Sequence, residues 1–326
     1  MSLLLFVQGL WRFTQRVLNK NGLPDWQLSP DGSIVGTGSA SDADVDIALA
    51  LLVASEKFEQ KKWNNNGSTT DTSYISAAKV FIENIYDSEV SRETFMLEPG
   101  DSWCEDDVTE CNPTYNPSYF SPAHFSLFAE VTGNTGWNKV IDAGFSFLSD
   151  DCAVHNKGTG LVADWTESTS DCTPGKDQIF WDRDNGADYY YDAIRTPWRL
   201  ALSAAWDCEE RALAQEALLA AFFRSTGAEG LQRGFTVEGV SLGEEGDSSC
   251  FISTSATAMV PGPYFSASNG TSLSLDARHR RHAQGTIESW WEATLNSADD
   301  DAGYFCTTLR LLSLIFQAGI STRPLL

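Results

Sequence analysis

Helical periodicity is the feature of this sequence that most constrains its fold. Apolar residues recur at spacings of three and four through most of the chain, which is the pattern of amphipathic helices. No strong hairpin signal accompanies them, so the strands must be few and short. We expect an all-α protein with helices over residues 3–19, 42–59, 72–86, 121–131, 136–149, 188–206, 209–224, 251–260, 285–297 and 302–318.

Long polar loops separate these helices. Two examples, built from small and polar residues, are WNNNGSTTDT and EGVSLGEEGDSS. Ordinary up-down bundles have short loops, whereas a helical array can carry its function on elaborate loops. No linker rich in Pro and Ser divides the chain, so we expect one domain over residues 1–326.

Charge and hydropathy exclude two kinds of partner. The formal net charge is −23, which argues against a nucleic-acid partner because such proteins need a basic surface. No apolar run is long enough to span a bilayer, so no membrane partner is expected. Aromatic residues make up 12% of the chain, and they can serve a core or a sugar-binding cleft equally well.

The cysteines indicate the compartment. There are seven, without any CxxC, and only four histidines, so we expect neither a metal site nor an organic cofactor. Pairs that flank polar loops indicate an oxidising, extracellular or periplasmic location, with the signal peptide not in this chain. The expected pairs are Cys104–Cys111 and Cys152–Cys172, with Cys208–Cys250 as a third candidate. Cys306 lies in an apolar segment and is expected to be a buried thiol.

The stretch from Ala40 to Phe58 is the first that suggests chemistry. Ser41 is suited to cap a helix, and acids in a first turn complement the helix dipole. That explains one or two acids, but Asp42, Asp44 and Asp46 alternate ahead of a helix that is apolar on nearly all sides. Such a helix is central, so the acids would lie at one end of the core, where a cleft can open.

The second stretch is YYYDAIRTPWRL, residues 189–200. Asp192 and Arg195 are three residues apart, so on a helix they share a face and can form an ion pair. Pro197 favours the start or a kink of a helix at this point. The pair can be purely structural, but the density of aromatic residues around it argues against a solvated face.

The third stretch is NPSYFSPAHF, residues 116–125, which contains Tyr119. Ser121 is a plausible helix cap and Pro122 a first helical residue, so this is a rigid loop that leads into a helix. From the residues alone, a loop-anchoring aromatic cluster is slightly favoured over a functional site.

These segments resemble glycoside hydrolase family 8. Ala40 to Phe58 is similar, position by position, to the signature around that family's active-site aspartate. NPSYFSP, YDAIRTPWRL, GYFCTTLRLLSLIFQAG and the segment from Leu10 to Trp26 are also similar and come in the family's order. The resemblance covers nearly the whole chain and implies an (α/α)6 barrel of six inner and six outer helices. The expected helices are about two short of twelve.

The resemblance also implies an activity: inverting hydrolysis of internal β-1,4-glycosidic bonds in cellulose or a related β-glucan. Inverting enzymes protonate the leaving oxygen with one carboxylic acid and activate water with a second carboxylate. By resemblance the general base is Asp192, held ionised and oriented by Arg195. The other implied roles are positioning of the water by Tyr119, binding of the sugar at the cleavage point by Asp42, and stacking of sugar rings on Trp26 and Tyr191.

One departure from the family concerns its general acid. In the family this is a glutamate well upstream of the residue that Asp42 matches, but the first glutamate here is Glu56. We therefore expect an N-terminally shortened form that lacks the first one to two helices and the proton donor.

Alternatives remain within and beyond this class of enzyme. Asp192 in its motif fits glucanases and xylanases better than chitosanases, whereas the acidic charge favours cationic chitosan. A non-catalytic carbohydrate-binding remnant is a further alternative, and a helical scaffold is the weakest. The expected partner is a β-1,4-linked polysaccharide or oligosaccharide, bound by a monomer.

Overall fold

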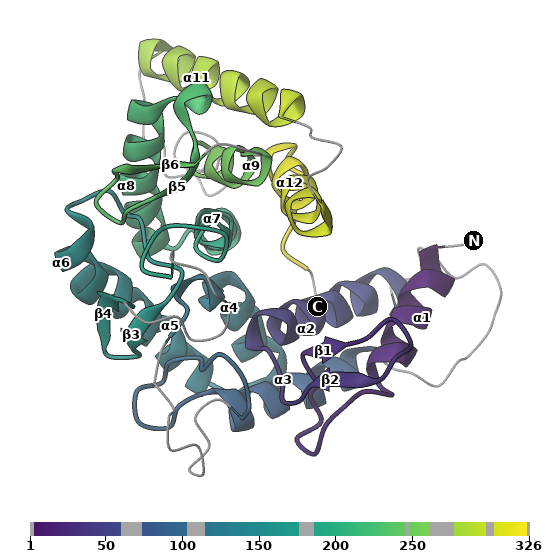
Figure 1. The fold of residues 1–326 in the computed structure, drawn as a ribbon. Coiled ribbons are helices and arrows are strands. Elements are labelled where there is room, and N and C mark those ends of the chain that lie inside the picture. The colour runs from purple at the N-terminus through teal and green to yellow at the C-terminus, as the bar shows by residue number, and fades with distance from the viewer. Residues whose placement is uncertain are drawn as a thin grey trace. The chain divides into compact units, whose positions relative to one another are not determined.

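The structure is a computed structural model that describes residues 3–59, 74–102, 115–175, 186–244, 248–260, 277–297 and 303–324. Its contacts divide the chain into two compact units (Figure 1). The first comprises Met1–Cys111, His124–Ile141 and Arg323–Leu326, and the second comprises Asn112–Ala123 and Asp142–Thr322. One domain over residues 1–326 stays a prediction, and each unit is described by itself.

The predicted helical class is confirmed, with helices close to the expected ranges. The longer helices are α1 (Leu3–Thr14), α2 (Ser41–Glu59), α3 (Tyr74–Glu89), α4 (Pro122–Thr132), α5 (Gly136–Ser146), α7 (Arg195–Asp207), α8 (Glu210–Thr226), α9 (Ser249–Thr257), α11 (Ala277–Asn296) and α12 (Gly303–Gln317). Short helical turns are η1 (Pro117–Tyr119), the π-helical η2 (Phe147–Cys152), α6 (Ala153–Asn156) and η3 (Ala228–Gly230).

The strands in the described residues are short, as expected. They form three antiparallel two-stranded sheets: β1 (Gln27–Leu28) with β2 (Ile34–Gly36), β3 (Thr166–Ser168) with β4 (Asp171–Pro174), and β5 (Arg233–Phe235) with β6 (Ser241–Glu244). Each pair shows a register shift. These small sheets are local hairpins, so the helices supply the framework.

In the first unit, α2 and α3 pack against each other. The core of this unit also includes Trp137 of α5, which is fully buried. Its indole stacks on Phe125 of α4 at 5.2 Å between ring centroids and meets Phe128 and Tyr86 edge-on. This aromatic cluster therefore fixes α3, α4 and the start of α5 to one another.

In the second unit, α9 is the central helix. It contacts α7, α8, α11 and α12, which lie around it in Figure 1. Its sequence is rich in Ser and Thr, yet almost the whole helix is buried. The hydroxyls of Ser253 and Thr254 donate to the carbonyl of Cys250, and that of Thr257 donates to the carbonyl of Thr254. Burial is tolerated because these polar groups are satisfied within the helix.

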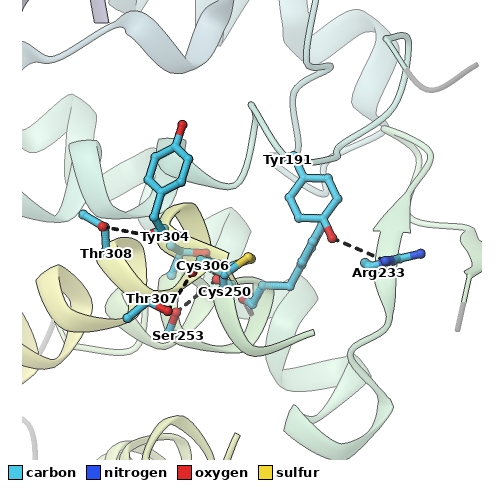
Figure 2. Close-up of a disulfide and its surroundings, with 11 residues drawn as sticks. Tyr191, Arg233, Cys250, Ser253, Tyr304, Cys306, Thr307 and Thr308 are labelled. Carbon is cyan, nitrogen blue, oxygen red and sulfur yellow. Dashed lines mark hydrogen bonds between the residues drawn. A yellow bond between two sulfur atoms is a disulfide. The ribbon is translucent and has the colours of Figure 1, made fainter. Parts of the chain in front are cut away.

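Two disulfides join segments of the second unit. Cys152–Cys172 is confirmed. The Cys208–Cys250 candidate and the buried thiol at Cys306 are wrong, because Cys250 of α9 is joined to Cys306 of α12 (Figure 2). Cys208 is exposed and takes part in neither disulfide. Cys104 and Cys111 lie outside the described residues.

Three helix boundaries differ from expectation by five residues or more. The helix α11 begins at Ala277, eight residues before its predicted start. The helix α1 ends at Thr14, whereas the periodicity continues to residue 19. The helix α7 begins at Arg195, seven residues after its predicted start. Its upstream backbone is engaged elsewhere, because Tyr189 exchanges backbone hydrogen bonds with Phe235 at 2.8 and 3.1 Å.

Among the helices in the described part of the chain, none combines the length and apolar character that a membrane crossing requires.

Candidate active site

Asp192 lies in a tight turn between an extended segment and α7. Tyr189 ends the extended segment, and the N–H of Arg195 donates to the carbonyl of Asp192 at 3.2 Å. Pro197 lies in the first turn of α7, where its missing N–H disrupts no helical hydrogen bond. The expected helix start near Pro197 is thus confirmed, and Asp192 precedes the helix.

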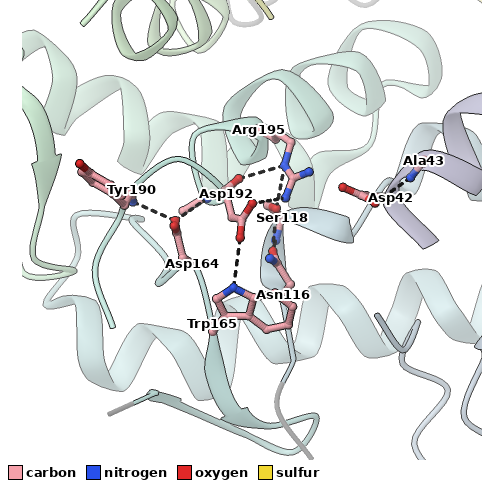
Figure 3. Close-up of polar contacts among 10 residues, drawn as sticks. Asp42, Ala43, Asn116, Ser118, Asp164, Trp165, Tyr190, Asp192 and Arg195 are labelled. Atoms are coloured by element: carbon pink, nitrogen blue, oxygen red, sulfur yellow. Dashed lines mark hydrogen bonds and ion pairs between the residues drawn. The ribbon is translucent and has the colours of Figure 1, made fainter. Parts of the chain in front are cut away.

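The predicted ion pair between Asp192 and Arg195 is confirmed. Nη2 of Arg195 lies 2.9 Å from Oδ1 of Asp192 (Figure 3). The side chain of Arg195 is 9% exposed and that of Asp192 is 34% exposed. The pair therefore presents a carboxylate that is held by a cation and that water can reach.

Arg195 is itself fixed by three further contacts. Its Nε donates to Oγ of Ser118 and to the carbonyl of Asp192, each at 3.1 Å. Its guanidinium lies over the ring of Tyr119, 5.0 Å from the centroid. The cation therefore has one orientation, set by η1 on one side and the Asp192 turn on the other.

The loop that carries Tyr119 is rigid, as the sequence predicts. Oδ1 of Asn116 caps η1 by accepting from the N–H of Ser118 at 3.1 Å and from its hydroxyl at 2.7 Å. Pro122 is the first residue of α4, as predicted, whereas the hydroxyl of Ser121 donates to the carbonyl of Tyr119. Tyr119 is thereby held beside Arg195 and, edge-on, beside Trp165 at 6.2 Å.

Two residues near Asp192 were missed in the sequence. Nε1 of Trp165 donates to Oδ2 of Asp192 at 3.1 Å, so each carboxylate oxygen has a donor (Figure 3). The neighbouring Asp164 accepts at Oδ1 from the N–H groups of Tyr190 and Ala193, at 2.9 and 2.7 Å. The local sequence offers one signal for them: Asp164 and Trp165 directly follow the apolar run Leu161–Ala163 within a polar loop.

Asp164 is buried beside Asp192. Burial raises the pKa of its carboxyl group well above the usual value, and the charge of Asp192 raises it further. The backbone N–H groups that it accepts act in the opposite direction and are outweighed. The surroundings of Asp164 therefore favour its protonated form.

Tyr191 is half-buried in an aromatic cluster. Its ring meets Tyr190, Phe251 and Phe305 edge-on, at 4.7, 5.3 and 6.2 Å between centroids. Nη1 of Arg233 lies 3.5 Å from its hydroxyl (Figure 2). Its role as a stacking platform stays a prediction.

Asp42 and Trp26 belong to the first unit. Asp42 is partly buried in the first turn of α2, where its Oδ1 accepts from the N–H of Ala43 at 2.8 Å. Trp26 is 46% exposed, and its indole lies against Gly36, where any Cβ would come within 2.3 Å of the ring. An exposed indole on a glycine backbone suits ring stacking, but the roles of both residues stay predictions.

Asp44, the second acid of the same motif, is fully buried, and so is Glu89 of α3. Burial raises the pKa of both carboxyl groups, and the charge of Glu89 raises that of Asp44 further. Among the described residues, neither carboxylate oxygen of Asp44 has a hydrogen-bond partner, whereas Oε1 of Glu89 accepts from Ser39. The acid at position 44 is thus enclosed in the interior of the first unit.

These two acids should make the first unit less stable at alkaline pH. Both carboxyl groups have a higher pKa in the folded protein than in the unfolded chain. Their contribution to the free energy of unfolding is therefore complete below the ordinary carboxyl pKa of about 4, and it is lost as the pH rises through the raised pKa values. Glu89→Gln should therefore lose less of its unfolding free energy than the wild type between pH 5 and pH 9. Guanidinium unfolding across this range measures the difference.

The matched control is Asp87→Asn on the same helix. Asp87 forms an exposed ion pair with Arg92, at 2.7 Å, which is worth little in stability. The free energy of unfolding of Asp87→Asn should change with pH in the same way as that of the wild type. Parallel curves for all three proteins would contradict the raised pKa of Glu89.

Within the part of the chain that the structure describes, no group of three or more His, Cys, Asp or Glu side chains is arranged to hold a metal ion.

The chain matches the sequence model of glycosyl hydrolases family 8 over residues 5–319. The chain belongs to glycoside hydrolase family 8, and the (α/α)6 barrel class predicted for it is that of its structural relatives.

Similar proteins are endoglucanases. The chain is 33% identical to Endoglucanase A of Acetivibrio thermocellus and 35% identical to Endoglucanase C of Ruminiclostridium cellulolyticum, over 97% and 95% of its length. It spans 58% of the length of each of these relatives. A solved apo structure of a β-1,3-1,4-glucanase from Paenibacillus sp. X4 aligns with a TM-score of 0.77 and 26% identity, over 95% of this chain and 75% of that one.

Proposed function

We propose that the protein hydrolyses internal β-1,4-glycosidic bonds of cellulose or a related β-glucan with inversion of configuration, and that Asp192 is its general base. In this reaction water attacks the anomeric carbon while the bond to the leaving oxygen breaks. Asp192 takes a proton from the water, and the leaving oxygen receives one from a general acid.

The environment of Asp192 carries this proposal. Its carboxylate is paired with a nearly buried arginine and is still 34% exposed. Each oxygen accepts one hydrogen bond, at 2.9 and 3.1 Å, and keeps a lone pair for the water. A surface ion pair on a solvated helix would have neither the indole donor nor the aromatic neighbours.

The remaining residues take supporting roles. Arg195 keeps Asp192 ionised and oriented, and Tyr119, under the guanidinium, helps to position the water. Asp42 binds the sugar at the cleavage point, while Trp26 and Tyr191 offer rings to neighbouring sugars. The two disulfides support an extracellular or periplasmic location, where such bonds persist.

Turnover assays test the proposal. Release of reducing ends is measured on carboxymethyl cellulose, mixed-linkage glucan, xylan and chitosan, together with hydrolysis of dinitrophenyl β-cellotrioside. The activated glycoside separates the role of the base from that of the acid, because dinitrophenolate leaves without a proton. We expect turnover of the activated glycoside, with the α-anomer as the first product seen by NMR. Turnover of the β-glucans should be much slower, because no residue of this sequence matches the family's general acid.

Each other outcome has a definite meaning. Turnover confined to xylan or chitosan would reassign the polymer but keep the reaction. Binding of cello-oligosaccharides without turnover of even the activated glycoside would support a non-catalytic carbohydrate-binding protein. The β-anomer as first product would contradict inversion.

A further inference from the structure

We propose that Asp164 and Trp165 are positioning residues for the general base: Asp164 fixes the backbone of the turn that carries Asp192, and Trp165 fixes the plane of its carboxylate. This inference rests on the proposed role of Asp192. It assigns a function to a dipeptide that lies 27 residues upstream in the sequence and comes from a different loop.

Asp164 ties down the turn on both sides of the base. The two N–H groups that its Oδ1 accepts belong to Tyr190, two residues before Asp192, and Ala193, one residue after it. Asp164 is itself held, because its own N–H donates to the carbonyl of Asp188 at 2.8 Å. The turn between Tyr190 and Ala193 is therefore clamped by one buried oxygen.

A neutral acid suits this task. An oxygen of a protonated carboxyl group still accepts two N–H donors, and it places no second negative charge beside Asp192. The burial that raises the pKa of Asp164 also shields its hydrogen bonds from water. An amide has the same shape and the same neutral acceptor, so asparagine should replace Asp164 with little loss.

Trp165 fixes the rotation of the carboxylate. The terminal torsion of an aspartate is broad when nothing restrains it. Arg195 donates to one oxygen and Trp165 to the other, so a rotation about this torsion breaks both contacts. The lone pairs that remain then point in defined directions, as a base in hydrogen-bond reach of one water requires.

Trp165 is held in its own place from two directions. The backbone N–H of Trp165 donates to the carbonyl of Gly186 at 2.8 Å. The backbone carbonyl of Trp165 accepts from the N–H of Gly175 at 2.9 Å. Its ring also lies edge-on to Tyr119, the residue beneath Arg195. The indole donor is thus as firmly placed as the guanidinium donor on the opposite oxygen.

Two substitutions separate positioning from sugar stacking. Trp165→Phe keeps an aromatic ring but removes the donor, whereas Trp165→Ala removes both. Positioning predicts that both variants lose kcat by about 10- to 100-fold, as expected for a misplaced reacting group, with KM nearly unchanged.

Asp164 is tested by a matched pair of variants. Asp164→Asn should retain most of the activity, and Asp164→Ala should lose kcat to a similar extent as Trp165→Phe. Trp206→Phe is the control for loss of an indole donor, because Nε1 of Trp206 donates to the carbonyl of Ser321 at 2.9 Å elsewhere in the second unit. Its kinetics should match the wild type.

The outcomes distinguish this inference from the function on which it rests. If Asp192→Asn is inactive while Trp165→Phe keeps wild-type kcat, the positioning role is overturned and the base remains. If Asp192→Asn keeps full turnover, the proposed function fails first. Where Asp164→Ala does not fold, as circular dichroism will show, the two Trp165 variants decide.

Discussion

Asp192→Asn should abolish nearly all turnover while leaving binding intact. An amide of the same shape can accept from Arg195 or Trp165 but cannot take a proton from water, and general base assistance is worth about 10²- to 10⁴-fold in rate. We expect kcat on β-glucan and on dinitrophenyl β-cellotrioside to fall by this factor. Affinity for cellopentaose, measured by calorimetry, should stay within a few-fold of the wild type.

The control is a second Asp–Arg pair in the same unit. Asp142 lies 2.7 Å from Arg211, but its side chain is 70% exposed, so Asp142→Asn should keep full activity. Added azide should restore turnover of the activated glycoside by Asp192→Ala, because azide attacks the anomeric carbon without needing a base to remove a proton. The product should be the α-glycosyl azide. Unchanged turnover in Asp192→Asn would contradict the assignment.

Removal of the disulfide between α9 and α12 should produce the largest loss of stability. The two cysteines are 56 residues apart, and closing a loop of that length constrains the unfolded chain by about 4 kcal/mol. Cys250→Ser with Cys306→Ser should lower the free energy of unfolding by about this amount. Urea unfolding followed by tryptophan fluorescence measures it.

Two further variants calibrate that result. The loop between Cys152 and Cys172 is shorter, with a separation of 20 residues, so its removal should cost about 3 kcal/mol. Cys208→Ser should cost nothing measurable, since Cys208 is exposed and outside both disulfides. Equal stability of the wild type and the variant without Cys250 and Cys306 would show that this bond does not form in solution.

The site was predictable where its chemistry is local in sequence. Asp192 and Arg195 are three residues apart, and aromatic residues surround them, so one short segment carries the pair. Trp165 was not predictable because its contact with Asp192 depends on the pairing of two loops. A polar loop has no hydrophobic periodicity, so the sequence does not distinguish an Asp–Trp dipeptide that positions a base from any other loop residues.

The same distinction applies to the fold. Hydrophobic periodicity placed the helices because it depends on neighbours in the chain. It failed at residues 188–194, where Tyr189 pairs with a distant strand instead of continuing a helix. It also failed for Cys306. A cysteine at an apolar position of a helix gives the same sequence pattern whether it is a buried thiol or forms a disulfide with a cysteine of another helix, as Cys306 does with Cys250.

The buried carboxyl groups change what the formal charge of −23 describes. That value counts every Asp and Glu as ionised, which suits an unfolded chain at neutral pH. In the folded protein, Asp164, Asp44 and Glu216 are all buried, and burial raises the pKa of each well above its usual value. We therefore expect the native molecule to be less negative than its sequence indicates and to carry protons in its interior. Those protons would pass to the buffer on unfolding, so the heat of unfolding should depend on the ionisation enthalpy of the buffer.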